Sequence, residues 1–263
     1  MENLKAVIIL EAEKYKKLVR LYIPDADFAH GEKCRISEGQ AHYLRSVMRK
    51  TPGDALRVFN GRDGDWLATI SELNKKNALL EMDHKLLEQE RSPDIWVLAS
   101  PVKKEAFDLM IEKSCELGAA RFTPVVCEHT VVHKINQERL QAIAIEAAEQ
   151  SERFDVMSVD PLMDLKKCLV STCCDRNIIF CIERARAASL SETARELAGR
   201  PLVLLIGPEG GFSSREIEFI RGLKYVNAVT LGPRILKSET ALIAALSGVQ
   251  LLIPPWNPVS GED

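Results

Sequence analysis

Hydrophobic residues follow one pattern before residue 90 and another after it. In the first part they form short runs, at residues 21–24, 56–59, 66–70 and 78–82. Gly, Pro and Asn separate these runs, as they do between β-strands joined by tight turns. The pattern predicts a small β-rich domain over residues 20–90, preceded by an N-terminal extension over residues 1–19 to which no role is assigned.

One amphipathic helix is predicted inside this β-rich part, over residues 38–50. Its apolar face carries Ala41, Leu44, Val47 and Met48. Its basic side chains, His42, Arg45, Arg49 and Lys50, fall mostly on the other faces.

From residue 91 to residue 263, strand-like runs alternate with helix-length segments. The predicted strands are residues 95–100, 122–126, 178–182, 202–206 and 226–231. The predicted helices are residues 104–117, 137–151, 190–197, 214–222 and 238–252. Nearly continuous apolar strands in such an alternation indicate an α/β domain with a parallel sheet covered on both faces. Ligands are then expected at the carboxyl ends of the strands.

Composition and charge narrow the possible functions. The chain of 263 residues is 46% hydrophobic and 28% charged, which is typical of a globular protein of one large or two modest domains. Its formal net charge of -3 gives no overall attraction to nucleic acid or anionic membranes. An anionic partner must therefore meet a local basic patch.

The seven cysteines and the apolar segments indicate the compartment. The cysteines form no CxxC motif and no Cys/His spacing suited to zinc, so free thiols in a reducing cytoplasm and no metal site are expected. His129 and His133 are expected to be loop or edge residues, because the residues between them are β-branched. The longest apolar stretch, residues 241–253, is shorter than the about 20 residues that cross a bilayer, and the N-terminus lacks a secretory signal.

The most informative segment is residues 205–216, with the sequence LIGPEGGFSSRE. A buried strand runs into a glycine-rich turn, and Ser213 with Glu216 forms a capping box that begins a helix. The turn matches neither GxGxxG nor a P-loop. Glu209 would repel a phosphate but favour a positively charged ligand such as a sulfonium. The alternative is that Glu209 only complements the helix N-terminus.

A second loop, residues 231–241, has the sequence LGPRILKSETA and also joins a strand to a helix, with Ser238 as the expected N-cap. Two such loops on neighbouring strands would enclose one pocket. Arg234 and Lys237 would then meet an RNA phosphate or stabilise charge on a base, unless they are simply solvated.

Basic residues also concentrate in the β-rich part. Residues 41–62 contain Arg45, Arg49, Lys50, Arg57 and Arg62. Against them stands one acid, Asp54, so the local net charge is 5 − 1 = +4 in a chain of net charge -3. A cluster of this kind can position an RNA through its phosphates. The alternative is the basic face of a surface helix.

These motifs resemble those of the ribosomal RNA small subunit methyltransferase E family, within the SPOUT superfamily. The resemblance rests on IGPEGGFS followed by Glu, and on LGPRILKSETA. Residues 112–118, 146–153 and 42–54 add matches to the family's K-x-x-E-L-G, E-A-x-E-Q-S-x-R and H-x-x-x-V-L-R patterns. The resemblance covers residues 20–254.

The resemblance implies a PUA-like β-barrel followed by a trefoil-knotted α/β methyltransferase domain. It further implies a homodimer that uses S-adenosylmethionine to methylate N3 of a uridine in 16S rRNA of the small ribosomal subunit. Family members usually carry Arg-Thr where Lys237 and Ser238 stand, a change that keeps the charge and the hydroxyl. They also have a Pro soon after the Glu-Gln-Ser motif, whereas here none precedes Pro161.

The residues expected at the site follow from the loop motifs and from the family resemblance. The cofactor is expected to contact Ile182, Glu183, Ile206, Gly207, Pro208, Glu209, Gly210, Gly211, Leu231, Gly232, Pro233, Ile235 and Leu236. The RNA is expected to contact Arg20, Arg45, Arg49, Lys50, Arg57, Arg62 and Lys237. Arg234 is expected to stabilise developing oxygen charge, and Glu239 to act as a base or orienting group, or only to complement the helix dipole.

Three other activities remain as alternatives. The first is a SPOUT methyltransferase acting on a ribose 2′-oxygen or a guanine, and the second is a catalytically silent RNA-binding module. The third, a Rossmann dehydrogenase, is disfavoured because the chain lacks GxGxxG and an acidic ribose partner at the expected distance.

Overall fold

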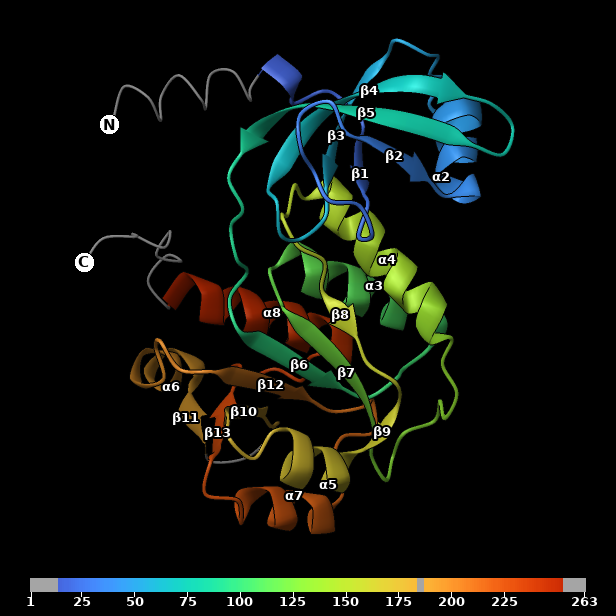
Figure 1. The fold of residues 1–263 in the computed structure, drawn as a ribbon. Helices are drawn as coiled ribbons and strands as arrows, with labels where there is room; N and C mark the ends of the chain where they lie inside the picture. Colours follow the sequence, from blue (N-terminus) through green and yellow to red (C-terminus); the bar gives the residue numbers. More distant parts are fainter. Residues whose placement is uncertain (1–13, 184–186, 253–263) are drawn as a thin grey trace, which may run out of the picture. The chain divides into compact units, whose positions relative to one another are not determined.

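The computed structural model describes residues 14–183 and 187–252, in two compact units. The first unit comprises Met1–Arg91 and Glu149–Asp155, and the second comprises Ser92–Ala148 and Val156–Asp263. Residues 88–93, which join them in sequence, have no regular secondary structure (Figure 1). Most of the predicted N-terminal extension, residues 1–13, lies outside the described residues.

The first unit is built on a five-stranded sheet. Its strand order is β1 (Arg20–Tyr22), β3 (Ala55–Phe59), β4 (Asp65–Leu73), β5 (Ala78–Leu87) and β2 (Lys33–Ile36). β1 and β3 are parallel and the other pairs are antiparallel. The four predicted runs overlap β1, β3, β4 and β5, so the β-rich character of this part is confirmed. β2 was missed because only its last residue is buried and its pattern is mostly polar.

The helix predicted over residues 38–50 is shorter than expected and changes its winding. α2 (Glu38–His42) begins at a capping box formed by Ser37 and Gln40 and continues as a π-helical turn, η1 (Tyr43–Val47). Because the extra residue in that turn shifts the register, only the first half of the predicted apolar face is buried. Ala41 and Leu44 are fully buried, but Val47 is 60% exposed and Met48 is 38% exposed. The four apolar residues predicted to share one helix face are therefore divided, with Val47 and Met48 in solvent.

This turn ends in an unfavourable backbone conformation at Arg49. Its φ is 53°, in the left-handed region, and the Lys50 amide donates to the Leu44 carbonyl at 2.9 Å. Glycine usually occupies such a position at a helix end, because a side chain there costs about 1 kcal/mol. The sequence thus places an arginine where a glycine would be more stable.

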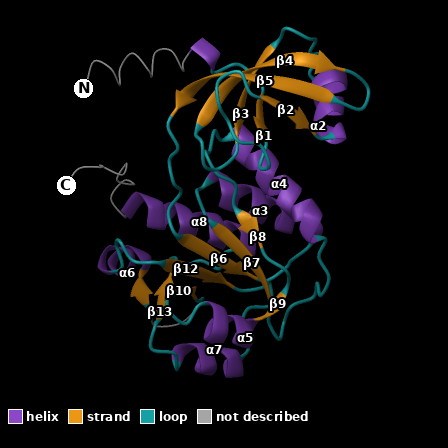
Figure 2. Cartoon of the chain, viewed as in Figure 1, coloured by secondary structure: helices purple, strands orange, loops and turns teal. Residues whose placement is uncertain are grey.

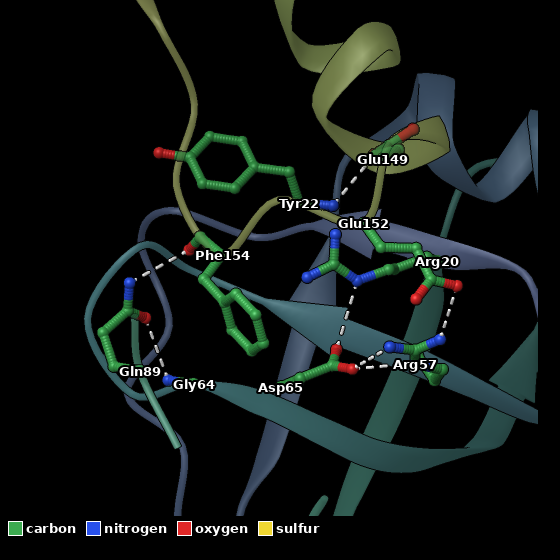
Figure 3. A network of polar contacts seen from close by, with 9 residues as sticks. All are labelled: Arg20, Tyr22, Arg57, Gly64, Asp65, Gln89, Glu149, Glu152 and Phe154. Atoms are coloured by element: carbon green, nitrogen blue, oxygen red, sulfur yellow. Dashed lines mark hydrogen bonds and ion pairs between the residues drawn. The ribbon is translucent and has the colours of Figure 1, made fainter. Parts of the chain in front are cut away.

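The segment Glu149–Asp155 completes the first unit, although it lies far along the chain (Figure 3). The backbone amide of Tyr22 donates to Glu149 Oε1 at 2.9 Å, and Arg57 Nη1 donates to Glu152 Oε1 at 3.0 Å. The Phe154 carbonyl accepts from Gln89 Nε2 at 3.3 Å. These bonds join β1, β3 and the coil after β5 to one short segment from later in the chain.

The second unit contains an eight-stranded sheet in which every described pair is parallel (Figure 2). The order is β11 (Ala188–Ser189), β13 (Val226–Thr230), β10 (Asn177–Cys181), β12 (Leu202–Ile206), β6 (Ile95–Ala99), β7 (Arg121–Val126) and β8 (Ser158–Val159). β9 (Met163–Asp164) pairs with β7. The mixed α/β fold with a parallel sheet is confirmed.

Helices cover both faces of this sheet. They are α3 (Lys104–Glu116), α4 (Gln137–Gln150), α5 (Leu165–Lys167), α6 (Leu190–Glu196), α7 (Ser214–Arg221) and α8 (Ser238–Leu252), with a π-helical turn, η2 (Cys168–Thr172). Figure 1 shows α3 and α8 on one face and α5 and α7 on the other. Val203 and Leu205 belong to the core on the α7 side, and the alternate residues Leu202 and Leu204 are equally buried. This two-sided burial explains the continuous apolar pattern of β12.

The predicted strands and helices of this unit match the structure to within about two residues at each end, which is the usual uncertainty of element boundaries. The elements missed are the two-residue strands β8, β9 and β11 and the short helical segments α5 and η2. Such short elements carry no repeating hydrophobic pattern, so nothing in the sequence distinguishes them from loops.

Candidate functional site

Three predicted ligand segments follow three adjacent strands of the parallel sheet. Ile182 and Glu183 follow β10, the glycine loop (residues 207–211) follows β12, and residues 231–236 follow β13. Since the strands are parallel, their carboxyl ends lie at one edge. β12 and β13 are not neighbours, however, because β10 lies between them. The expectation of neighbouring strands is corrected in this respect.

The glycine loop is a tight turn whose shape depends on small residues. The amide of Gly211 donates to the Pro208 carbonyl at 2.9 Å, and Gly211 has a φ of 68°. A Cβ atom on Gly207 would lie 2.7 Å from the Phe212 ring, which packs edge to face on Phe180. The backbone at Gly207 thus approaches this aromatic pair more closely than any side chain allows.

The beginning of α8 is hydrogen-bonded to the glycine loop. Ser238 is the first residue of α8 and is buried, and its hydroxyl donates to the Gly207 carbonyl at 2.8 Å. The predicted N-cap role of Ser238 is therefore corrected: the hydroxyl bonds across to another loop. The bond joins the segments after β12 and β13, 31 residues apart.

The loop after β13 is more exposed. The Thr230 hydroxyl accepts from the Gly232 amide and donates to its carbonyl, both at 3.2 Å, and Gly232 has a φ of 117°. Arg234 and Lys237 are exposed, and Glu239 in the first turn of α8 is half-buried. Ile235 is 55% exposed, so an apolar side chain stands in solvent beside these charged groups.

A fourth segment, residues 127–130 after β7, contacts the glycine loop and was not predicted. We call it the β7 turn. The buried carboxylate of Glu216 accepts from the amides of Glu128 and Ser213, both at 2.8 Å. The predicted capping box of Ser213 and Glu216 is confirmed. Glu216 therefore has two functions, since it also ties the β7 turn to the start of α7.

His129, in this same turn, contacts the glycine loop directly. Its Nδ1 lies 3.1 Å from the carbonyl oxygens of both Gly210 and Gly211. Only the tautomer that carries a proton on Nδ1 can donate to these acceptors. A Cβ on Gly210 would lie 3.0 Å from the Cβ of His129. The prediction that His129 is a loop residue is confirmed, but its contact, 81 residues away, has no signal in the sequence.

The β7 turn is also closed by buried hydroxyls. Ser100 Oγ and Thr130 Oγ1 are 2.6 Å apart, and Thr130 Oγ1 accepts from the Cys127 amide at 2.7 Å. Burial, reinforced by the negative charge of Glu216, raises the pKa of the Cys127 thiol to about 12. The thiol is therefore held neutral inside the turn.

All seven cysteines are free thiols, and they are expected to differ in reactivity. At pH 8 the Cys127 thiol stays protonated, because burial raises its pKa to about 12. We expect iodoacetamide to modify the exposed Cys174 while Cys127 stays unmodified in the folded protein. Peptide mass spectrometry after timed alkylation measures this. Equal labelling of the two residues before unfolding would contradict the buried environment of Cys127.

The predicted RNA-binding cations fall into two groups. Arg20 and Arg57 are 6% and 3% exposed, and both donate to the buried carboxylate of Asp65 (Figure 3). The Nε atom of Arg57 lies 2.7 Å from Asp65 Oδ2, and that of Arg20 lies 3.3 Å from Oδ1. Burial lowers the pKa of Arg20, and the Asp65 charge opposes this effect. The prediction that Arg20 and Arg57 contact RNA is corrected, because their guanidinium groups are inside the unit.

Arg62 is also committed to partners, although it is exposed. Its guanidinium donates to the carbonyls of Pro24 and Ala26 and pairs with Asp27 at 2.9 Å. Arg45 and Arg49 are exposed and Lys50 is half-buried. Among residues 14–183 and 187–252, none of these three side chains makes a salt bridge or a hydrogen bond, although the pKa of Asp54 is lowered by its bonds from Thr51 and by the charge of Lys50. They remain the candidate phosphate contacts of the first unit.

Within the described ranges, no group of His, Cys, Asp or Glu side chains has the arrangement of a metal site. No helix of the described residues has the length and apolar character of a membrane span.

The comparisons with known families give the class of this protein. A family model for an RNA methyltransferase domain matches residues 89–250, and one for an RNA methyltransferase PUA domain matches residues 36–83. The first match spans more than half of the chain, so the parallel sheet and its carboxyl-edge loops form an RNA methyltransferase domain.

Individual relatives narrow the class. The ribosomal RNA small subunit methyltransferase E of Rickettsia conorii is 29% identical over 90% of this chain and 96% of its own length. That of Synechocystis is 32% identical over 83% of this chain and 73% of its own. A crystal structure of the Neisseria gonorrhoeae enzyme, bound to S-adenosyl methionine, has a TM-score of 0.79 and 29% identity, over 90% of this chain and 98% of that one. The chain belongs to the ribosomal RNA small subunit methyltransferase E family.

Proposed function

We propose that this protein transfers a methyl group from S-adenosylmethionine to N3 of a uridine in 16S rRNA of the small ribosomal subunit. The observation that carries the proposal is the meeting of three loops at one edge of the parallel sheet, in a chain of this family.

The residues at this edge fit the proposed cofactor. Glu183 and Glu209 are exposed carboxylates on the loops after β10 and β12, where they favour a sulfonium. Gly207 and Gly210 let the loop backbone pack closely on Phe212 and His129, which a Cβ at either position would crowd, and so fix the shape of the loop. Residues 231–236, with the exposed apolar Ile235, supply the remaining wall. The bound cofactor supplies an activated methyl group, and the protein supplies orientation.

Methylation of uridine N3 requires charged side chains near the base. Uridine N3 carries a proton at neutral pH, so the reaction needs loss of this proton and stabilisation of the resulting negative charge. Arg234 is an exposed cation of the loop after β13, and we assign it to the uridine oxygens, where the charge develops. Glu239, in the first turn of α8, is assigned the role of base or orienting group.

The resemblance also carries finer proposals about architecture. We propose that the first unit closes into a PUA-like barrel and that the loops after β12 and β13 belong to a trefoil knot. The Ser238–Gly207 bond supports the knot, because it brings the start of the last helix against an earlier loop. A barrel domain over residues 20–90, a methyltransferase domain over residues 91–263, a homodimer and a cytoplasmic location complete the proposal.

The activity is tested with purified protein, S-adenosylmethionine and either 16S rRNA or isolated small subunits. We expect 3-methyluridine in the nucleoside digest by mass spectrometry. Formation of a 2′-O-methylated nucleoside or a methylguanosine would show that the enzyme methylates a different acceptor, as other SPOUT methyltransferases do. Cofactor binding without any methylated nucleoside on either substrate would identify a silent RNA-binding protein.

Arg234→Gln is expected to lower kcat about 100-fold, the typical cost of losing one group that stabilises developing charge. The Kd for S-adenosylmethionine should stay within about twofold, because the assigned role is toward the uridine. Arg221→Gln, an exposed arginine at the end of α7, is the control and should leave kcat unchanged. Equal kcat values for the two variants would remove Arg234 from the mechanism.

His129→Ala is expected to raise the Kd for S-adenosylmethionine about fivefold, because it removes the donor that holds the Gly210 and Gly211 carbonyls. His129→Asn, which keeps a side-chain N–H, should restore most of the affinity. His133→Ala, an exposed histidine four residues on, is the control. Calorimetric titration gives the three values, and an unchanged Kd for His129→Ala would contradict this positioning role.

A further inference from the structure

An exposed turn of the first unit combines three cations with two apolar side chains. We call residues 45–50 the basic turn; it contains Arg45, Arg49 and Lys50. No Asp or Glu occurs between His42 and Gly53, and the next acid, Asp54, accepts a bond from the Thr51 amide at 2.7 Å. This bond and the charge of Lys50 lower the pKa of the Asp54 carboxyl, whereas Arg45 and Arg49 have no acid among their near neighbours in sequence, so the turn keeps a net positive charge.

Two apolar side chains stand among these cations. Val47 and Met48 are exposed because the π-helical turn η1 rotates them off the buried face that Leu44 occupies. The Met48 amide still bonds to the Tyr43 carbonyl at 3.0 Å, so this exposure belongs to a hydrogen-bonded turn. π-Helical turns of this kind occur frequently at functional sites.

The backbone of Arg49 gives an independent indication. A non-glycine residue in the left-handed region lowers stability, and such positions are concentrated at functional sites. Glycine would be accepted there without this cost. An arginine at this position is explained if its guanidinium has a use that outweighs the backbone penalty.

We infer that the basic turn binds an unpaired segment of RNA, with Arg45, Arg49 and Lys50 on its phosphates and Val47 and Met48 against an unstacked base. This inference rests on the proposed function and names the form of RNA that the first unit takes. In a duplex the faces of the bases are covered by stacking, and only the backbone and the base edges are presented, so the apolar pair would find no base face to contact. An unpaired segment offers both an anionic backbone and an apolar base face.

The first test replaces the strained residue. Arg49→Gly should raise the midpoint of thermal unfolding by about 2–4 °C, because it relieves the backbone, and should weaken binding of a single-stranded RNA about tenfold. A purely structural role of Arg49 predicts the stabilisation alone. Fluorescence anisotropy with a labelled single-stranded RNA and a hairpin duplex, at several salt concentrations, provides the affinities.

The second test separates charge from apolar contact. The double variant Val47→Ser with Met48→Ser should lose about tenfold in affinity for single-stranded RNA, with no change for the duplex and no change in salt dependence. The double variant Arg45→Gln with Lys50→Gln should weaken binding to both RNAs and reduce the salt slope by about 0.7 per cation on single strands. Lys75→Gln with Lys76→Gln, in the exposed turn between β4 and β5, is the control and should match the parent.

Either of two results would overturn the inference. One is a serine variant that binds each RNA with the same affinity as the parent, and the other is an Arg49→Gly variant whose RNA affinity is unchanged. Binding of the parent to anionic vesicles, with no effect of these variants on RNA, would identify a membrane surface instead. Methyl transfer by the parent is measured in parallel. If the parent methylates 16S rRNA and the variants behave like it, only the inference fails; if no methylation occurs, the proposed function fails separately.

Discussion

Replacing Gly210 by Val is expected to abolish binding of S-adenosylmethionine, with at least a 100-fold rise in Kd. A Cβ at this position would lie 3.0 Å from the Cβ of His129, and the two further methyl groups of valine need still more room. The loop can admit them only by moving away from the β7 turn, which breaks the bonds from His129 to the Gly210 and Gly211 carbonyls. A 100-fold loss is about 2.7 kcal/mol of binding energy.

Calorimetric titration measures this Kd, and circular dichroism establishes that the variant is folded. Gly39→Val makes the same chemical change in α2, where the nearest atom to an added Cβ is 4.0 Å away, and should bind the cofactor as the parent does. Gly210→Ala adds only the Cβ and should weaken binding about tenfold, so the prediction can be tested even if the valine variant does not fold. Parent-like affinity of both Gly210 variants would exclude the glycine loop from the cofactor site.

Asp65→Asn is expected to be the most destabilising change in the first unit, at about 3–5 kcal/mol. The Asp65 carboxylate is completely buried and accepts bonds from Arg20 and Arg57, whose side chains are each 4% exposed (Figure 3). An amide leaves two buried guanidinium groups without their shared negative charge. Burying a charge that has lost its partner is far more costly than losing an ion pair in solvent.

Hydrogen exchange resolves this effect by unit. Protection of β3 and β4 should fall in Asp65→Asn, while protection of β12 in the second unit should change little. Glu81→Gln is the control, because its ion pair with Lys33 is about half exposed and should contribute at most about 1 kcal/mol. If Asp65→Asn and Glu81→Gln lose protection equally, the buried network is not what stabilises this unit.

The periodicity of the sequence predicted most elements because burial is periodic in both units. β12 is buried on both faces and reads as five consecutive apolar residues, whereas α7 alternates exposed and buried positions with a helical period. The glycine loop was found in the same way, from a strand followed by glycines and a capping box. These are local signals, which a single sequence carries.

Contacts between distant segments were not predictable. The approach of His129 to Gly210 and the bond from Ser238 to Gly207 depend on strand order, and the order β13-β10-β12 differs from the order along the chain. Charge was misread for the same reason. The sequence does not distinguish Arg57 from Arg49. Arg57 is buried in an ion pair because other segments place Asp65 and Glu152 beside it.

The return of residues Glu149–Asp155 to the first unit has a consequence for the order of synthesis. Glu149 and Glu152 bond to Tyr22 and Arg57, so the first unit is complete only after these later residues have left the ribosomal exit tunnel. Until then, the β-sheet of residues 20–87 lacks these contacts, while α3, β7 and most of α4 are being translated. Domains usually fold in the order in which they emerge. In this chain, the N-terminal unit reaches its final form only after a large part of the second unit has been made.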